Sequence, residues 1–141
     1  MATMDGSGEF TATLARYAQA MDRLYSGDPE PIKALYFHGD ETSQCGYWGG
    51  VERGWAEVGA RWDWVATQIV PGENTHSQEI LLTSVTAEMA YAVFIERAQV
   101  RLVDQPDPQQ IAVRVTAVFR REGDDWKAVH RHGDSLVTKN R

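Results

Sequence analysis

The sequence predicts an α+β fold in which helices come first and a run of long strands follows. In the first half, apolar residues recur three or four positions apart, which is typical of amphipathic helices. In the second half, four β-rich segments are separated by short turns. Helices followed by a run of strands favour an α+β layer architecture. The 141 residues suit one domain, and we predict a disordered tail over residues 1–8 and a single domain over residues 9–141.

The N-terminal half is expected to hold three helices and two short strands. An apolar stripe at helical spacing predicts a helix over residues 10–24, and a proline near its first turn begins a short one at 29–35. Short strands are expected at 36–40 and 42–48. A third helix is predicted over residues 51–69, because tryptophans and aliphatic residues form one stripe there before a Pro-Gly stop.

The C-terminal half is expected to be an antiparallel meander. Its strands are predicted over residues 75–86, 90–103, 111–121 and 126–137. The connections between them are short and rich in turn residues, and such connections join antiparallel neighbours.

The last hairpin predicts which side chains face inward. Its loop is Glu122 to Asp125, so Arg121 lies opposite Trp126. When this register is continued residue by residue, one face of the hairpin is apolar except for His130, His132 and Asp134. Because the apolar face packs inward, we expect these three side chains inside and Arg131 outside with the other cations.

Glu96 is a carboxylate on the apolar face of the preceding strand, next to Phe94. Burial would make its charge costly unless it is paired, and could raise its pKa. The alternative, with the opposite facing, is an ion pair of Glu96 with Arg114 or Arg97. A carboxylate and histidines on one apolar face are the ingredients of acid–base chemistry.

Composition excludes several classes of partner. A net charge of -6 argues against nucleic acid, and no apolar run approaches the ~20 residues that span a bilayer. The N-terminus lacks the pattern of a secretory signal, so we expect a cytoplasmic location. Cys45 is the one cysteine, which excludes an intrachain disulfide, and its neighbours do not suggest a metal cluster.

Five stretches, in their order and spacing, resemble the SnoaL-like domain of the nuclear-transport-factor-like and ketosteroid-isomerase-like superfamily. They are Gly27-Asp-Pro-Glu-Pro31, Gly50-Val-Glu-Arg-Gly-Trp55, Ala90-Tyr91 with Ile95-Glu-Arg97, Val113-Arg-Val-Thr116 with Phe119-Arg-Arg121, and Trp126-Lys-Ala-Val-His-Arg-His132. The resemblance implies a cone: a curved, mainly antiparallel sheet wrapped around the N-terminal helices and enclosing an apolar pocket. It further implies a homodimer through the outer sheet face and proton transfer without a metal or other cofactor.

On this basis the chain is expected to bind a small hydrophobic molecule and to act as an isomerase, cyclase or dehydratase on a carbonyl or hydroxyl compound. His130 or Glu96 would abstract or deliver the proton, and His132 would orient or polarise the substrate. The candidate substrate-binding residues are Tyr17, His38, Asp40, Trp48, Trp55, Phe94, Phe119 and Asp134. The alternative is a non-catalytic module that binds a ligand or oligomerises, like the association domain of calcium/calmodulin-dependent kinases. A metal held by the two histidines with Asp134 or Glu96 is a weaker option.

Overall fold

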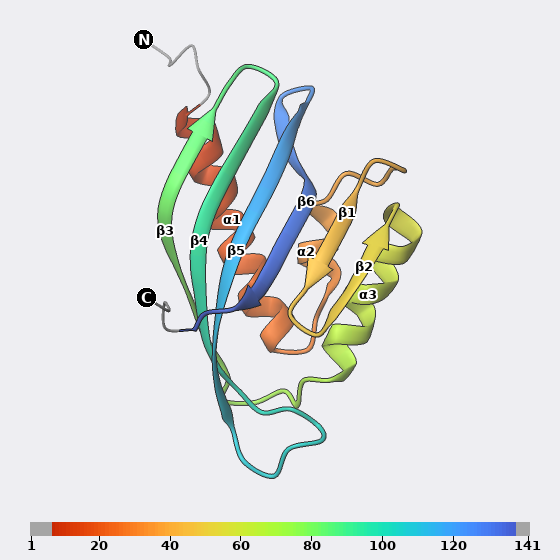
Figure 1. Cartoon of the computed structure of the whole chain (residues 1–141), viewed down its shortest axis with the longest axis vertical. Coiled ribbons are helices and arrows are strands. Elements are labelled where there is room, and N and C mark those ends of the chain that lie inside the picture. The colour runs from red at the N-terminus through yellow and green to blue at the C-terminus, as the bar shows by residue number, and fades with distance from the viewer. Residues whose placement is uncertain (1–6, 138–141) are drawn as a thin grey trace.

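The computed structural model describes residues 7–137 as three helices and one six-stranded sheet (Figure 1). The elements are α1 (Ser7–Tyr25), α2 (Glu30–Ala34), β1 (Ser43–Gly46), β2 (Gly49–Arg53), α3 (Trp55–Thr67), β3 (Thr75–Val85), β4 (Met89–Val100), β5 (Gln109–Glu122) and β6 (Asp125–Ser135). Residues 1–6 of the predicted tail lie outside the described residues, whereas Ser7 and Gly8 already belong to α1. Within residues 7–137, no helix is both long and apolar enough to cross a membrane.

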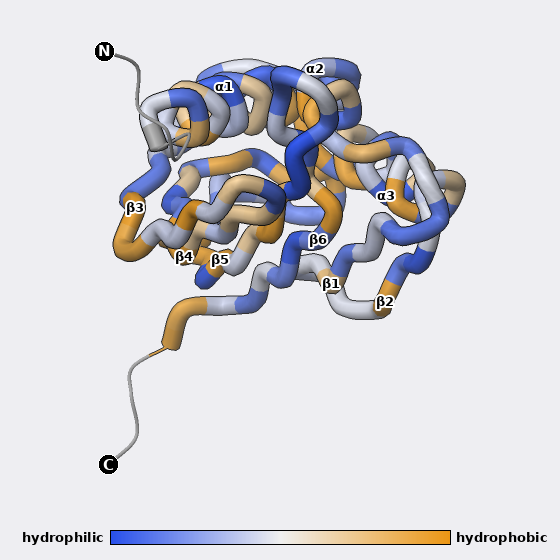
Figure 2. The backbone as a smooth tube through the Cα atoms, turned by 90° about the horizontal axis from the view of Figure 1, so that it is seen from above, coloured by the Kyte–Doolittle hydropathy of each residue, from blue (hydrophilic) through white to orange (hydrophobic). Residues whose placement is uncertain are grey.

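The sheet has the strand order β2-β1-β6-β5-β4-β3, and the helices pack along one of its faces (Figures 1 and 2). The predicted meander of β3 to β6 is confirmed as consecutive antiparallel pairs. The β1–β2 hairpin extends the sheet because β1 pairs with β6 in parallel. The α+β class with a curved, unclosed sheet over N-terminal helices is therefore confirmed.

The core lies between the inner sheet face and α1. Phe10, Leu14 and Tyr17 of α1 are fully buried at helical spacing. Phe94 and Phe119 meet them from β4 and β5, and Tyr17 contacts both rings edge-on. Each fully buried aliphatic or aromatic side chain of this kind contributes about 1.5–3 kcal/mol through removal from water. The inner faces predicted for β4 and β5 are confirmed.

Two segments of the N-terminal half differ from the prediction. Residues 51–53 belong to strand β2, and α3 begins only at Trp55, after Gly54 at a φ of 83°. The Glu57 carboxylate accepts a hydrogen bond from the Arg53 backbone N–H and fixes this start. Tyr36, expected in a strand, forms only an isolated bridge to Ala128. The apolar stripe of α3 continues back through Val51, so periodicity alone does not separate strand from helix there.

A β-bulge in β6 overturns the predicted register of the last hairpin. Arg121 pairs with Trp126 and Phe119 with Ala128, as expected, but Val118 then pairs with His130. Val129 is the extra residue, and every later side chain of β6 changes face because successive side chains alternate. The inward orientation predicted for His130, His132 and Asp134 is therefore wrong, and so is the outward orientation predicted for Arg131.

Candidate functional site

A buried ion pair joins β4 to β6 inside the cone. Arg131 donates from Nη2 to Glu96 Oε1 at 2.6 Å and from Nη1 to Glu96 Oε2 at 3.0 Å. The inward facing of Glu96 is thus confirmed, with the side chain 1% exposed, and its partner is neither Arg114 nor Arg97. Two parallel N–H···O bonds suit the planar fork of arginine, which is the side chain best able to pair a buried carboxylate.

The pair keeps the Glu96 carboxylate ionised. Burial alone would raise the pKa of this group, but the charge and hydrogen bonds of Arg131, with His76 nearby, outweigh it and bring the pKa to about 2. The raised pKa considered from the sequence is therefore wrong. A group with so low a pKa is a weak proton acceptor near neutral pH.

A directed chain of hydrogen bonds continues from the ion pair to Gln44 on β1. Arg131 Nη1 donates to the Tyr17 hydroxyl at 3.2 Å, and Tyr36 donates to Gln44 Oε1 at 3.1 Å. The two hydroxyls lie 3.1 Å apart. Because Tyr36 has a single proton and gives it to Gln44, Tyr17 is the donor between them. Burial raises the pKa of both phenols, so both stay protonated. We call Tyr17, Tyr36, Gln44, Glu96 and Arg131 the inner network.

His76 on β3 joins Asp22 of α1 to the inner network. Its Nδ1 lies 2.8 Å from Asp22 Oδ1, and its ring stacks on Tyr25. Its Nε2 is buried without a hydrogen-bond partner among the described residues, 3.9 Å from Glu96 Oε2. Burial would lower the pKa of His76, but the carboxylates of Glu96 and Asp22 on its two sides raise it above its ordinary value.

A small cavity borders the inner network at Gln44 and Arg131. Its volume is about 40 Å³, which is room for about one water molecule. Arg131 and Gln44 are its polar groups on the side of the inner network, and Arg61 of α3 also lines it. Most of the other lining is apolar and includes Met21, Leu24, Tyr25, Trp62, Val65, Ile111 and Val113. The cavity is thus an apolar space with hydrogen-bonding groups on one side, the usual composition of a small-molecule site.

Aromatic side chains and one arginine close the mouth of this cavity. Tyr47 and Trp48, at the tip of the β1–β2 hairpin, line it together with Arg61 of α3. Trp48 contacts Trp64 edge-on at 5.6 Å, and the Arg61 guanidinium lies 4.2 Å over the Trp64 ring. Tyr47, Trp48 and Trp64 are each more than a third exposed. The cavity is therefore separated from solvent by a thin layer of side chains in contact with water.

The three side chains predicted to be catalytic do not lie together at one site. Glu96 lies inside the cone, whereas the bulge places His130 and His132 on the outer face of the sheet. His130 is half-buried there, with Nδ1 2.8 Å from Ser43 Oγ, and burial lowers its pKa. Asp134 also lies outside, where Arg114 holds it by two hydrogen bonds of 2.9 Å.

The predicted binding residues divide between cavity, core and surface. Trp48 lines the cavity, and Tyr17 belongs to the inner network beneath it. Phe94 and Phe119 are core residues with no exposed surface. The other four lie away from the cavity lining: Asp134 is on the outer face, His38 stacks on Trp55 at 3.8 Å, and Asp40 is an exposed turn residue.

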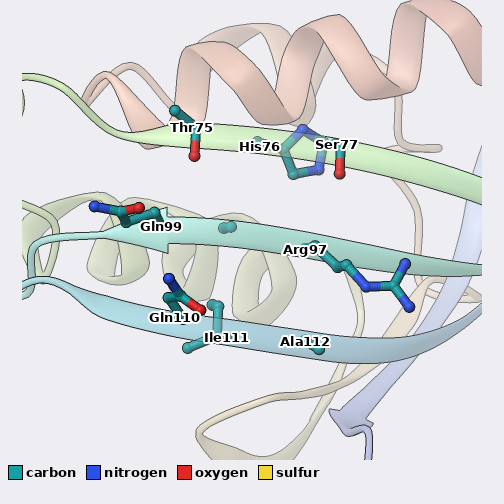
Figure 3. A pocket seen from close by; sticks show the side chains of 9 residues that line it. Thr75, His76, Ser77, Arg97, Gln99, Gln110, Ile111 and Ala112 are labelled. Carbon is teal, nitrogen blue, oxygen red and sulfur yellow. The ribbon is translucent and has the colours of Figure 1, made fainter.

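A larger hollow lies on the outer face of β3, β4 and β5 (Figure 3). It is an open groove of about 490 Å³ whose rim carries exposed polar side chains, among them Thr75, Ser77, Arg97, Gln99 and Gln110. It contains none of the predicted site residues. We place the candidate site in the cone, where charge, burial and hydrogen bonding combine.

Sequence reasoning missed three polar residues of the site: Arg131, Gln44 and His76. A signal for Arg131 existed, because a buried Glu96 needs a cationic partner, and a one-residue slip of β6 supplies one. His76 shares the inner-face alternation of β3 with Gln78. Gln44 carries no comparable signal, because its inward facing follows from the parallel pairing of β1 with β6.

The family model and the solved structures that resemble this chain agree with the fold described above. The family model of the SnoaL-like domain matches residues 10–138. A structure from Streptomyces avermitilis, assigned as a dehydratase of the NTF2-like family, is 19% identical with a TM-score of 0.76, over 93% of this chain and 96% of that one. A ketosteroid isomerase-like protein from Erwinia carotovora atroseptica is 14% identical with a TM-score of 0.74, over 96% and 100% of the two chains.

A third solved structure carries a different assignment. It is assigned as a calcium/calmodulin-dependent protein kinase type II association domain from Thiobacillus denitrificans, and is 20% identical with a TM-score of 0.72 over 90% of this chain and 94% of that one. At such identities these likenesses show the fold alone. No functionally curated protein matches the sequence significantly.

Proposed function

This chain belongs to the SnoaL-like family, and we propose that it binds a small, largely apolar molecule with one hydrogen-bond-accepting oxygen, such as a carbonyl or hydroxyl compound, in the cone cavity. The observation that carries the proposal is the position of Arg131, a buried guanidinium on the wall of an otherwise mainly apolar space. A buried charge at a cavity wall both orients a ligand and costs energy when it stays unsolvated.

Arg131 has donors to spare for such a ligand. A guanidinium carries five N–H groups, and hydrogen bonds to Glu96 and Tyr17 account for three of them among the described residues. An accepting oxygen in the cavity would occupy a remaining donor. A ligand larger than one water molecule also needs more room than about 40 Å³. The tip of the β1–β2 hairpin, with Tyr47 and Trp48, is the part of the lining that would move to admit it.

The binding test uses prodan, a fluorescent naphthalene with one ketone oxygen. Wild-type protein should bind one prodan per chain with a blue-shifted emission. Val65→Trp fills the cavity and should abolish saturable binding, whereas Val51→Trp, at a position 64% exposed, should leave it intact. Circular dichroism checks that both variants fold. Equal binding by the two folded variants would rule out the cavity as the site.

A matched ligand tests the role of the oxygen. The analogue 2-dimethylaminonaphthalene lacks the ketone and should bind roughly 10- to 150-fold more weakly, because one hydrogen bond to a charged donor contributes about 1.5–3 kcal/mol. Equal affinities would contradict a hydrogen bond from Arg131 and leave only apolar contact.

Proton transfer is a second candidate function, favoured by His76. Its pKa is raised, its Nε2 lacks a hydrogen-bond partner among the described residues, and it faces Glu96. His76 does not line the cavity but stacks on Tyr25, which does, so a small ketone that moved past Tyr25 could exchange its α-protons through this group. The test is α-proton exchange in D2O, followed by NMR for ketones that compete with prodan. Exchange that is present in wild type and lost in His76→Gln supports an isomerase-type activity, whereas binding without exchange supports a binding protein.

The same proposal includes a homodimer formed through the outer sheet face. On β3 and β4, Leu82, Met89 and Tyr91 are 53%, 41% and 39% exposed. Leu82 pairs with Val93 and Ser84 with Tyr91, so Leu82 and Tyr91 share the outer face. An apolar area on an otherwise charged sheet face is a feature of surfaces that associate. We call Leu82, Met89, Tyr91 and Val93 the outer apolar patch.

A further inference from the structure

The β-bulge brings three metal-ligating side chains together on the outer face of the sheet. Beyond Val129, the side chains of His130 and His132 project outward. Strand β1 runs parallel to β6 and pairs Ser43 with His130 and Cys45 with His132. Because paired residues share a face, Cys45 lies beside His132 and close to His130.

The distances within this group suit a common ion. One donor atom from each of Cys45, His130 and His132 lies within 4.8 Å of the other two. In a tetrahedral zinc site, with Zn–N near 2.0 Å and Zn–S near 2.3 Å, two nitrogens lie roughly 3.3 Å apart and a nitrogen and a sulfur roughly 3.5 Å apart. A contraction of about an ångström is within the reach of small side-chain rotations on two paired strands. We call these three residues the outer cluster.

The surroundings of the outer cluster also fit a metal site. Ser43 Oγ lies 2.8 Å from His130 Nδ1, which orients the imidazole and leaves Nε2 for an ion. Outer-shell hydrogen bonds of this kind orient most metal-bound histidines. Cys45 and His130 are half-buried, whereas His132 is exposed and gives an ion access.

The carboxylates considered from the sequence are not part of this group. Asp134 is held by Arg114, and Glu96 lies on the opposite face of the sheet in its pair with Arg131. The donor set is therefore one thiolate and two imidazoles, which selects zinc-like ions over magnesium or calcium.

We propose that Cys45, His130 and His132 bind one divalent transition-metal ion of the zinc type, with a fourth position open to water or an external ligand. The site is independent of the cone cavity, because its ligands point away from it.

The test titrates the purified, reduced protein with Co²⁺ and then with Zn²⁺. A thiolate–cobalt charge-transfer band together with the visible bands of tetrahedral Co²⁺ should appear, saturate at one ion per chain and disappear when Zn²⁺ is added. Cys45→Ser should remove the charge-transfer band, and His132→Ala should remove the tetrahedral bands. His38→Ala alters an exposed histidine outside the outer cluster and should change neither.

Two further measurements keep the proposal falsifiable. His132 is exposed, so His132→Ala should fold normally by circular dichroism even if a change at half-buried Cys45 disturbs the sheet. Ser43→Ala should weaken zinc binding about 10- to 100-fold without removing the charge-transfer band, as expected for an outer-shell partner. Cobalt bound without the charge-transfer band, or zinc affinity unchanged in both Cys45→Ser and His132→Ala, would overturn the proposal.

Discussion

Arg131 and Glu96 are joined by two hydrogen bonds across the inside of the cone, although they lie on β6 and β4 with β5 between them. Their side chains reach across the concave face of the sheet instead of pairing along it. The ion pair therefore links β6 to β4 across β5. Through the hydrogen bond from Arg131 to the Tyr17 hydroxyl, it also links the sheet to α1.

Removing one partner of this pair should destabilise the protein more than removing both. Arg131→Met leaves Glu96 buried without its cation and should cost about 3–5 kcal/mol of unfolding free energy. The double variant Arg131→Met/Glu96→Met replaces the pair by apolar side chains and should recover much of that loss. Urea unfolding of wild type, both single variants and the double variant measures the coupling. Additive losses would mean that the two side chains act independently.

Acid should weaken the fold through Glu96. Its pKa is about 2 in the folded protein against an ordinary value of 4.5, so the folded state favours the ionised form. The resulting stability, on the order of 3 kcal/mol, is present above about pH 4.5 and is lost as the pH falls toward 2. In Glu96→Gln this part of the pH dependence should be absent, which chemical unfolding at several pH values would reveal. An unchanged acid profile would contradict the depressed pKa.

Deletion of Val129 should remove the bulge without changing which side chains of β6 face inward. In the deletion variant His130 follows Ala128 directly, so it still pairs with Val118, and Arg131 still faces Glu96. We therefore expect this variant to keep a cooperative unfolding transition. Val129→Ala keeps the bulge and should also unfold cooperatively, at a lower Tm because a buried side chain is truncated. Loss of the cooperative transition in the deletion variant, measured by thermal unfolding, would contradict this account of the register.

His76 should titrate above its ordinary pKa of 6.5. Because the folded-state pKa is raised, its stabilising effect is complete below about pH 6.5 and is lost as the pH rises through the folded value. The stability difference between wild type and His76→Gln should thus be larger at about pH 5.5 than at about pH 8.5. NMR titration gives the pKa directly, and Asp22→Asn should lower it because the Nδ1 partner loses its charge. A pKa at or below 6.5 in wild type would refute this account.

The outer apolar patch should control self-association. Leu82→Lys/Tyr91→Lys places two like charges on it and should convert a dimer to a monomer in sedimentation velocity. Val103→Lys is a matched control, because Val103 is 54% exposed but lies in the connection after β4. A wild-type monomer, or a dimer unaffected by the double change, would rule out pairing through this surface.

The sequence predicted the fold well but located the polar residues of the site only in part. Alternation in β4 was sufficient to place Glu96 inside, because Ala92, Phe94 and Ala98 share its face. It failed beyond Ala128, where one extra residue reverses the facing of the strand while the amino-acid pattern stays plausible in either register. His130, His132 and Asp134 were misplaced for this reason alone. The resemblance implied an apolar pocket, but the polar part of its lining could not be predicted, because Gln44 reaches it through the parallel pairing of β1 with β6, two distant segments.

The parallel pairing of β1 with β6 also has a consequence for the synthesis of the chain. Ser43 and His130, which face each other across it, are 87 positions apart. A nascent chain emerging from the ribosome exposes β1 long before its partner strand exists, and neighbours of such high sequence separation join late and slowly in folding. Neither the inner network nor the outer cluster can assemble before β6 has been synthesised. Both form only when β6 inserts between β1 and β5 and completes the sheet.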